Sequence, residues 1–61
     1  MTTMIIDNKA TAKKSIEKYI IDTNEYQTLD SLMELAADCM NEEVYLIRVY
    51  KDDEELFTFR S

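Results

Sequence analysis

The sequence predicts a two-layer α+β domain in which two helices pack on a C-terminal antiparallel β-hairpin, preceded by a short N-terminal strand, in the order β-α-α-β-β. Apolar residues recur every three or four positions in residues 28–41, which indicates an amphipathic helix. Residues 44–50 and 56–60 are dense in β-branched and aromatic side chains and flank a short acidic segment, which indicates a hairpin. Gly and Pro are absent, and their absence favours few, long elements.

The first third of the chain is expected to hold a strand and a helix. Residues 2–6 are β-prone, so we expect an edge strand there, with a frayed end as the alternative. Residues 9–23 place apolar side chains at helical spacing, which predicts a first helix that stops at Asn24. These apolar side chains are Ala12, Ile16, Tyr19 and Ile20. In the connection that follows, Tyr26 is expected to fold back over the core.

The second helix carries two distinct faces. Thr28 is the expected N-cap, Asp30 lies in the first turn near the positive end of the helix dipole, and Asn41 is the expected left-handed stop. The apolar face consists of Leu29, Leu32, Met33, Ala36, Cys39 and Met40. On a face away from it, Asp30, Glu34 and Asp38 follow one another at four-residue spacing.

The register of the hairpin decides which residues of its two strands face the core. A three-residue loop at 52–54 pairs Lys51 with Glu55 and keeps both phenylalanines on the face of Ile47 and Val49, whereas a two-residue loop would separate them. The expected core face carries Tyr45, Ile47, Val49, Phe57 and Phe59. The opposite face carries Val44, Leu46, Arg48, Tyr50, Leu56, Thr58 and Arg60. Because that second face is also apolar, we expect a neighbouring strand, a second copy or a partner to cover it.

Length and composition favour one small cytoplasmic domain over residues 1–61. The chain has no apolar run of about 18 residues, so we expect no membrane span. Its N-terminus lacks the basic start and apolar core of a secretion signal. Cys39 is the only cysteine, so no internal disulfide forms, which agrees with a reducing compartment.

The net charge of −6 is distributed unevenly along the chain. Residues 1–20 hold four lysines against two acids, a net charge of +2. Residues 21–61 hold eleven acids against three bases, a net charge of −8. Such a balance repels nucleic acid and anionic membranes, so we expect neither as a direct partner.

The residue types argue against catalysis. Histidine is absent, which removes Ser-His, Cys-His and histidine-metal sites. Cys39 is expected to be a small buried hydrophobe, since its neighbours Asp38 and Glu42 are acidic and do not favour a reactive thiolate. The acids at 52–55 do not match a calcium loop, which needs alternating acids and a Gly. We therefore expect no enzymatic activity, no metal and no cofactor.

The acidic residues of the second helix form the main candidate binding surface. Asp30, Glu34 and Asp38 lie one helical turn apart, about 6 Å along the axis. One interpretation is an ordinary solvated helix face; the other is a row of carboxylates that imitates nucleic-acid phosphates and binds a basic groove. The full set of expected partner-binding residues is Asp30, Glu34, Asp38, Glu42, Glu43, Asp52, Asp53 and Glu54.

Residues 28–49 resemble a known kind of phage protein. The segments TLD at 28–30 and ELA at 34–36, followed by Arg48-Val49 in a strand, resemble the matching part of a small early inhibitor of bacterial RNA polymerase made by lytic phages. The predicted lysine-rich first helix stands where that inhibitor has strands, so no binding residues are carried over. In size and charge the chain is also similar to the tiny acidic phage proteins that block host enzymes, including anti-CRISPR and anti-restriction proteins.

These observations favour a non-catalytic, phage-type inhibitor that occupies a basic groove of a host nucleic-acid-handling protein in the host cytoplasm. Inhibition of host RNA polymerase is one alternative. Another is a small structural or regulatory module that acts through its apolar sheet face, as a homodimer or as a subunit. A partner protein with a basic surface is expected under the leading hypothesis.

Overall fold

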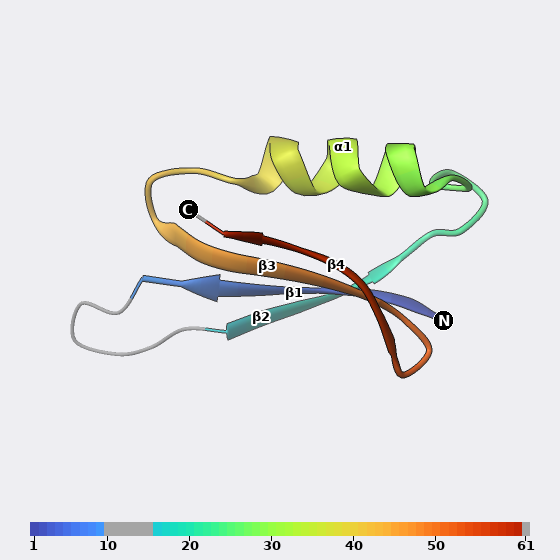
Figure 1. Ribbon diagram of the computed structural model, residues 1–61, viewed down its shortest axis with the longest axis horizontal. Coiled ribbons are helices and arrows are strands. Elements are labelled where there is room, and N and C mark those ends of the chain that lie inside the picture. The colour runs from blue at the N-terminus through green and yellow to red at the C-terminus, as the bar shows by residue number, and fades with distance from the viewer. Residues whose placement is uncertain (10–15, 61) are drawn as a thin grey trace.

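A computed structural model describes residues 1–9 and 16–60 of the protein. The elements are β1 (Thr2–Asn8), β2 (Ile16–Ile21), α1 (Leu29–Cys39), β3 (Val44–Lys51) and β4 (Glu54–Arg60). The strands form one antiparallel sheet in the order β2-β1-β3-β4, and α1 lies along one face of it (Figure 1). The α+β class is confirmed, but the order within the described residues is β-β-α-β-β.

The predicted first helix over 9–23 is wrong where the structure describes it. Residues 16–21 form β2, which pairs with β1 from Thr2 opposite Ile21 to Asp7 opposite Ile16. Isoleucines suit a pleated strand better than a helix because of their branched Cβ, and pairing with β1 decides the outcome. The remaining part of that prediction, at 10–15, lies outside the described residues.

The N-terminal strand is confirmed, and it is longer and more central than predicted. β1 covers Thr2–Asn8 and lies between β2 and β3, so it is no edge strand. Its side chains alternate between the helix-covered face, which we call the helix side, and the uncovered face, which we call the open face. Met4 and Ile6 lie on the helix side, where both are buried.

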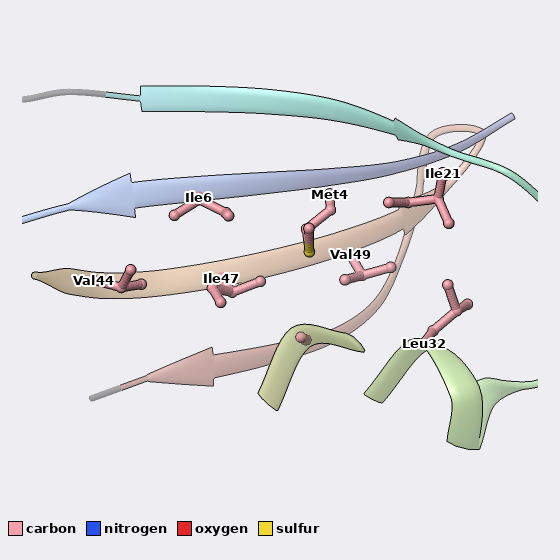
Figure 2. Close-up of a cluster of buried hydrophobic side chains, with 8 residues drawn as sticks. Met4, Ile6, Ile21, Leu32, Val44, Ile47 and Val49 are labelled. Atoms are coloured by element: carbon pink, nitrogen blue, oxygen red, sulfur yellow. The ribbon is translucent and has the colours of Figure 1, made fainter. Parts of the chain in front are cut away.

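The core fills the space between the helix side of the sheet and α1. Figure 2 shows side chains of β1, β2 and β3 pointing toward the helix, and Leu32 of α1 pointing toward the strands. The buried cluster consists of Met4, Ile6, Ile21, Leu32, Ala36, Val44, Ile47 and Val49. Tyr26 packs against this cluster, as predicted from its place in the connection before α1.

Helix α1 begins as predicted and ends differently. Thr28 is the N-cap in a capping box: the Ser31 backbone N–H donates to Thr28 Oγ1 at 3.1 Å, and the Thr28 backbone N–H donates to Ser31 Oγ at 3.1 Å. The helix ends at Cys39, and Met40 is an extended C-cap, so the predicted left-handed stop at Asn41 is wrong. Asn41 instead accepts a hydrogen bond from the Glu43 backbone N–H at 2.8 Å, which turns the chain into β3.

The predicted hairpin register is confirmed in the strand centres and wrong at the turn. Phe59 pairs with Ile47 and Phe57 pairs with Val49, as expected. Lys51 pairs with Glu54 instead of Glu55, because the turn has two residues and a bulge between Val49 and Tyr50 restores the register. Asp52 adopts a positive φ of 56°, a conformation that Asp tolerates better than most residues and that a chain without Gly must obtain this way.

Three further side chains lie elsewhere than predicted. A second irregularity, at Asp7/Asn8, places Val44 opposite Asn8 and Leu46 opposite Asp7. Val44 is therefore buried in the core at 3% exposure, and Tyr45 is 47% exposed instead of facing the core. Leu56, the extra residue of the hairpin bulge, packs partly against the core instead of lying on the open face.

Candidate protein-binding surface

Helix α1 presents its predicted acidic row to solvent. Asp30, Glu34 and Asp38 are exposed, on the side of the helix away from the buried Leu32 and Ala36. Within the described residues, none of the three carboxylates takes part in a side-chain hydrogen bond or ion pair. The row is therefore free to contact a partner without first breaking an internal interaction.

The remaining predicted acids divide between the two ends of β3. Glu42 and Glu43 are exposed and immediately precede the first residue of β3, next to the end of α1. Asp52, Asp53 and Glu54 follow its last residue. A strand of this length spans about 26 Å, so the eight predicted residues do not form one continuous row.

The hairpin-turn acids also differ in their surroundings. The Met1 amino group lies 2.7 Å from Asp52 Oδ1, and its hydrogen bond and positive charge lower the pKa of the Asp52 carboxyl below its ordinary value. Both side chains are largely exposed. The turn is thus an exposed, charged end of the molecule, where the Asp52 carboxylate already pairs with the Met1 amino group. It is separate from the acidic row of α1.

An open groove of about 990 Å³ runs between α1 and β2. Helix α1 forms one wall, β2 the other, and Met4 and Ile6 of β1 lie between them. The apolar side chains that line it on the helix side are Met4, Ile6, Ile21, Leu35, Cys39 and Val44, with Tyr19 and Tyr26. We call this feature the α1–β2 groove.

Acidic side chains surround the α1–β2 groove. Its acidic lining consists of Glu17, Asp22, Glu25, Asp38 and Glu43, and among the described residues Lys9 is the one base that lines it. Asp38 and Glu43 belong to the predicted set, whereas the other three acids do not. Sequence reasoning missed Glu17 because it was placed on a lysine-rich helix; its position opposite Ile6 in the sheet puts it on the helix side.

The acidic character of the groove affects Tyr19, which stands on its β2 wall. The negative charge of Glu17 is the largest effect that raises the pKa of the Tyr19 phenol above its ordinary value. Tyr19 is 44% exposed, so its ring offers apolar area to a ligand. At neutral pH the phenol is therefore uncharged, and the negative charge at this point of the groove belongs to Glu17.

The open face carries a different set of charges. Antiparallel partners share a face, so Lys18, Ile5, Arg48 and Thr58 form one row across it, and Ile16, Asp7, Leu46 and Arg60 form another. Arg48 contacts Asp7 at 3.3 Å, and Asp7 is only 5% exposed. Three of the five described basic residues therefore lie on this face, together with the acids Asp7 and Glu55.

No group of three or more Cys, Asp or Glu side chains within residues 1–9 and 16–60 is placed to hold a metal ion. No helix in these ranges is long and apolar enough to cross a membrane. Cys39 is partly buried and lines the α1–β2 groove, so the predicted buried position is reached only in part.

Comparison with protein-family models, with curated protein sequences and with solved structures finds no match to this chain. The resemblance of residues 28–49 to a phage inhibitor of RNA polymerase therefore stays a prediction. The sequence predicted a helix where that inhibitor has strands. Residues 16–21 form a strand instead, so this difference from the inhibitor does not hold there.

Proposed function

We propose that this protein is a non-catalytic inhibitor that acts by binding, with its acidic helix side occupying a basic groove of a nucleic-acid-handling protein. Anti-CRISPR and anti-restriction proteins of phages are the class that it resembles in size and charge. The observation that carries the proposal is the uneven distribution of charge between the two faces of the sheet. Exposed acids outnumber bases on the helix side, whereas on the open face Lys18, Arg48 and Arg60 outnumber Asp7 and Glu55.

The helix side has the properties that a basic surface recognises. Seven of its acidic residues are exposed: Glu17, Asp22, Glu25, Asp30, Glu34, Asp38 and Glu43. Carboxylates grouped on one face create a directed negative potential, which speeds encounter with a positive partner and disfavours other partners. The four-residue spacing on α1 keeps successive carboxylates about 6 Å apart, which makes a regular row of negative charges like a phosphate backbone.

A second candidate function is inhibition of a bacterial RNA polymerase. It is favoured by the two strands in the first part of the chain, because the phage inhibitor that residues 28–49 resemble has strands there as well. Under this candidate the acidic helix side again contacts a basic protein surface. The two candidates therefore differ in the identity of the partner and share the mode of binding.

A structural role through the open face is the competing hypothesis. Ile16 and Ile20 are 58% and 68% exposed on this face, and Ile5, Leu46 and Tyr50 are half-buried beside them. Apolar residues on an uncovered sheet face favour association with a second copy or a subunit. Such an interface would respond weakly to salt, whereas contact through the acidic helix side would respond strongly.

Affinity capture from a bacterial lysate tests the proposal. We expect immobilised wild-type protein to retain a basic nucleic-acid-handling protein that elutes on raising the salt concentration. The triple variant Asp30→Lys, Glu34→Lys and Asp38→Lys should lose that protein, and the open-face variant Lys18→Glu should retain it. Equal recovery by the wild type and the triple variant, or capture of acidic partners alone, would contradict the proposal.

A further inference from the structure

The α1–β2 groove exists because α1 covers only part of the helix side of the sheet. Apart from Val44, its lining residues come from β1, β2, α1 and the connections beside them. On the β2 wall, Glu17 and Tyr19 are exposed, and only Ile21 is buried. The apolar area that the groove exposes therefore comes mainly from Tyr19, Tyr26, Leu35 and Cys39, whereas Met4 and Ile6 at its floor are buried.

The dimensions of the groove suit a helical occupant. β2 has six residues, so its wall is about 20 Å long. A helix rises 1.5 Å per residue, so about thirteen residues, or between three and four turns, would run the length of this wall. An amphipathic helix lying in an apolar groove is a common mode of peptide recognition, with anchors at positions i, i+3 or i+4, and i+7.

The charges of the lining specify the polar part of that occupant. Carboxylates stand on both walls, with Glu17 on β2 and Asp38 on α1. Asp22 and Glu25 follow β2 at one end of the groove, and Glu43 precedes β3 at the other. An occupant with an apolar stripe flanked by basic residues would place the stripe between Tyr19 and Leu35 and its charges beside the carboxylates of both walls.

Within residues 1–9 and 16–60, a second copy of this protein offers no helix that meets those requirements. Its helix α1 carries Asp30, Glu34 and Asp38, and these acids would meet the acidic walls of the first copy. A strand added to the outer edge of β2 would lie beside the sheet and leave the groove open. The charge pattern therefore selects a partner segment of opposite sign.

We propose that the α1–β2 groove binds a cationic amphipathic helix of the partner protein. This inference rests on the proposed function, because it names the part of the basic partner that the acidic helix side receives. Apolar anchors of the helix contact the side chains of Tyr19, Tyr26 and Leu35, which are exposed or partly exposed in the groove. Lysine or arginine side chains beside those anchors pair with the carboxylates of the walls.

A synthetic peptide tests the groove directly. The probe is a fourteen-residue Leu/Lys peptide with leucines at i, i+3, i+4 and i+7; the control is a scrambled peptide of the same composition that cannot form an apolar stripe. Cys39 lines the groove and is the only cysteine, so its alkylation by neutral iodoacetamide reports occupancy. We expect the amphipathic peptide to slow alkylation at least fivefold and the scrambled peptide to leave the rate within twofold.

Matched charge variants separate the groove from general attraction. Glu17→Lys with Glu25→Lys changes two groove acids and leaves the acidic row of α1 intact. Asp53→Lys with Glu54→Lys makes the same change in charge at the hairpin turn. The groove variant should weaken peptide binding at least tenfold and the turn variant at most threefold. Equal losses in both variants, or unchanged Cys39 alkylation in the wild-type protein, would overturn the inference.

The outcomes for the groove and for the proposed function are distinguishable. If the groove inference fails alone, the captured partner still loses binding to the triple variant of α1 but binds the Glu17→Lys, Glu25→Lys variant like wild type. If the proposed function fails, the wild type and the triple variant of α1 capture the same proteins, whether or not the peptide binds the groove. Circular dichroism melting of each variant confirms that the compared proteins are folded.

Discussion

Substituting Ile47→Ala should lower the free energy of unfolding by about 2–4 kcal/mol, the usual cost of removing a large aliphatic side chain from a core. Ile47 is fully buried, in register with Ile6 on β1 and Phe59 on β4. Native stability is roughly 0.05–0.15 kcal/mol per residue, so a chain of this length has only about 3–9 kcal/mol to lose. We expect urea denaturation followed by circular dichroism to show a midpoint shifted far toward zero.

The matched control is Met33→Ala on α1. Met33 was predicted on the apolar face of the helix, but it is 37% exposed and lies outside the buried cluster. Its substitution should cost about 0.5 kcal/mol or less. If both variants melted like wild type, or if Met33→Ala were the more damaging, the core would be elsewhere than between β3 and α1.

Substituting Asp7→Ala should destabilise the fold by about 2 kcal/mol, the second-largest effect that we expect. Asp7 is buried on the open face beside Arg48, whose guanidinium contacts it at 3.3 Å. The Arg48 Nε atom is itself buried and has no hydrogen-bond partner among the described residues. Removal of the carboxylate would leave the guanidinium partly buried without its counter-charge.

A double-mutant cycle isolates this interaction. The pair Asp7→Leu with Arg48→Met replaces both charges by apolar groups of similar size, and such replacements are often neutral or stabilising. With Asp7→Leu and Arg48→Met also measured singly, we expect the double variant to recover most of the stability that Asp7→Leu alone loses. Additive losses at the two positions would show that the two side chains contribute independently.

How far the sequence predicts this fold depends on whether the signal is local. The capping box at Thr28 and the helical spacing that follows it are local, and both are confirmed. The pairing of Phe57 and Phe59 with Val49 and Ile47 follows from strand alternation and is also confirmed. The bulges are different, since their positions depend on how β1 and β4 fit against β3, and no sequence pattern announces them.

The incorrect first helix has a specific physical cause. In residues 16–21 both faces of the strand carry apolar side chains, with Ile16 and Ile20 on one and Tyr19 and Ile21 on the other. The alternation of polar and apolar residues that identifies a strand is therefore missing. The same isoleucines also satisfy helical spacing, and only pairing with β1 distinguishes the two structures.

The residues of the candidate site also divide into those that a local pattern locates and those that depend on tertiary structure. Asp30, Glu34 and Asp38 were located correctly because a helix fixes its own faces. Glu17 and Glu25 join them only through the position of β2 beside α1, which is a tertiary property. Conversely, Asp52, Asp53 and Glu54 were predicted to belong to the same surface because they are acidic, but they lie at the other end of β3, at the hairpin turn. The positions of acids along the chain thus assigned the hairpin-turn acids to a surface that they do not share, and they did not reveal the acids of the α1–β2 groove.

The most direct test of the central claim is the association rate of the captured partner, measured at low and at high salt. For wild-type protein we expect the rate to fall steeply as salt rises, because exposed charges steer the encounter. The variant with lysine at 30, 34 and 38 should associate on the order of tenfold more slowly at low salt, with a shallower salt dependence. A variant that associates as fast as wild type at both salt concentrations would contradict the claim, and would reduce the acidic row of α1 to a solvated helix face.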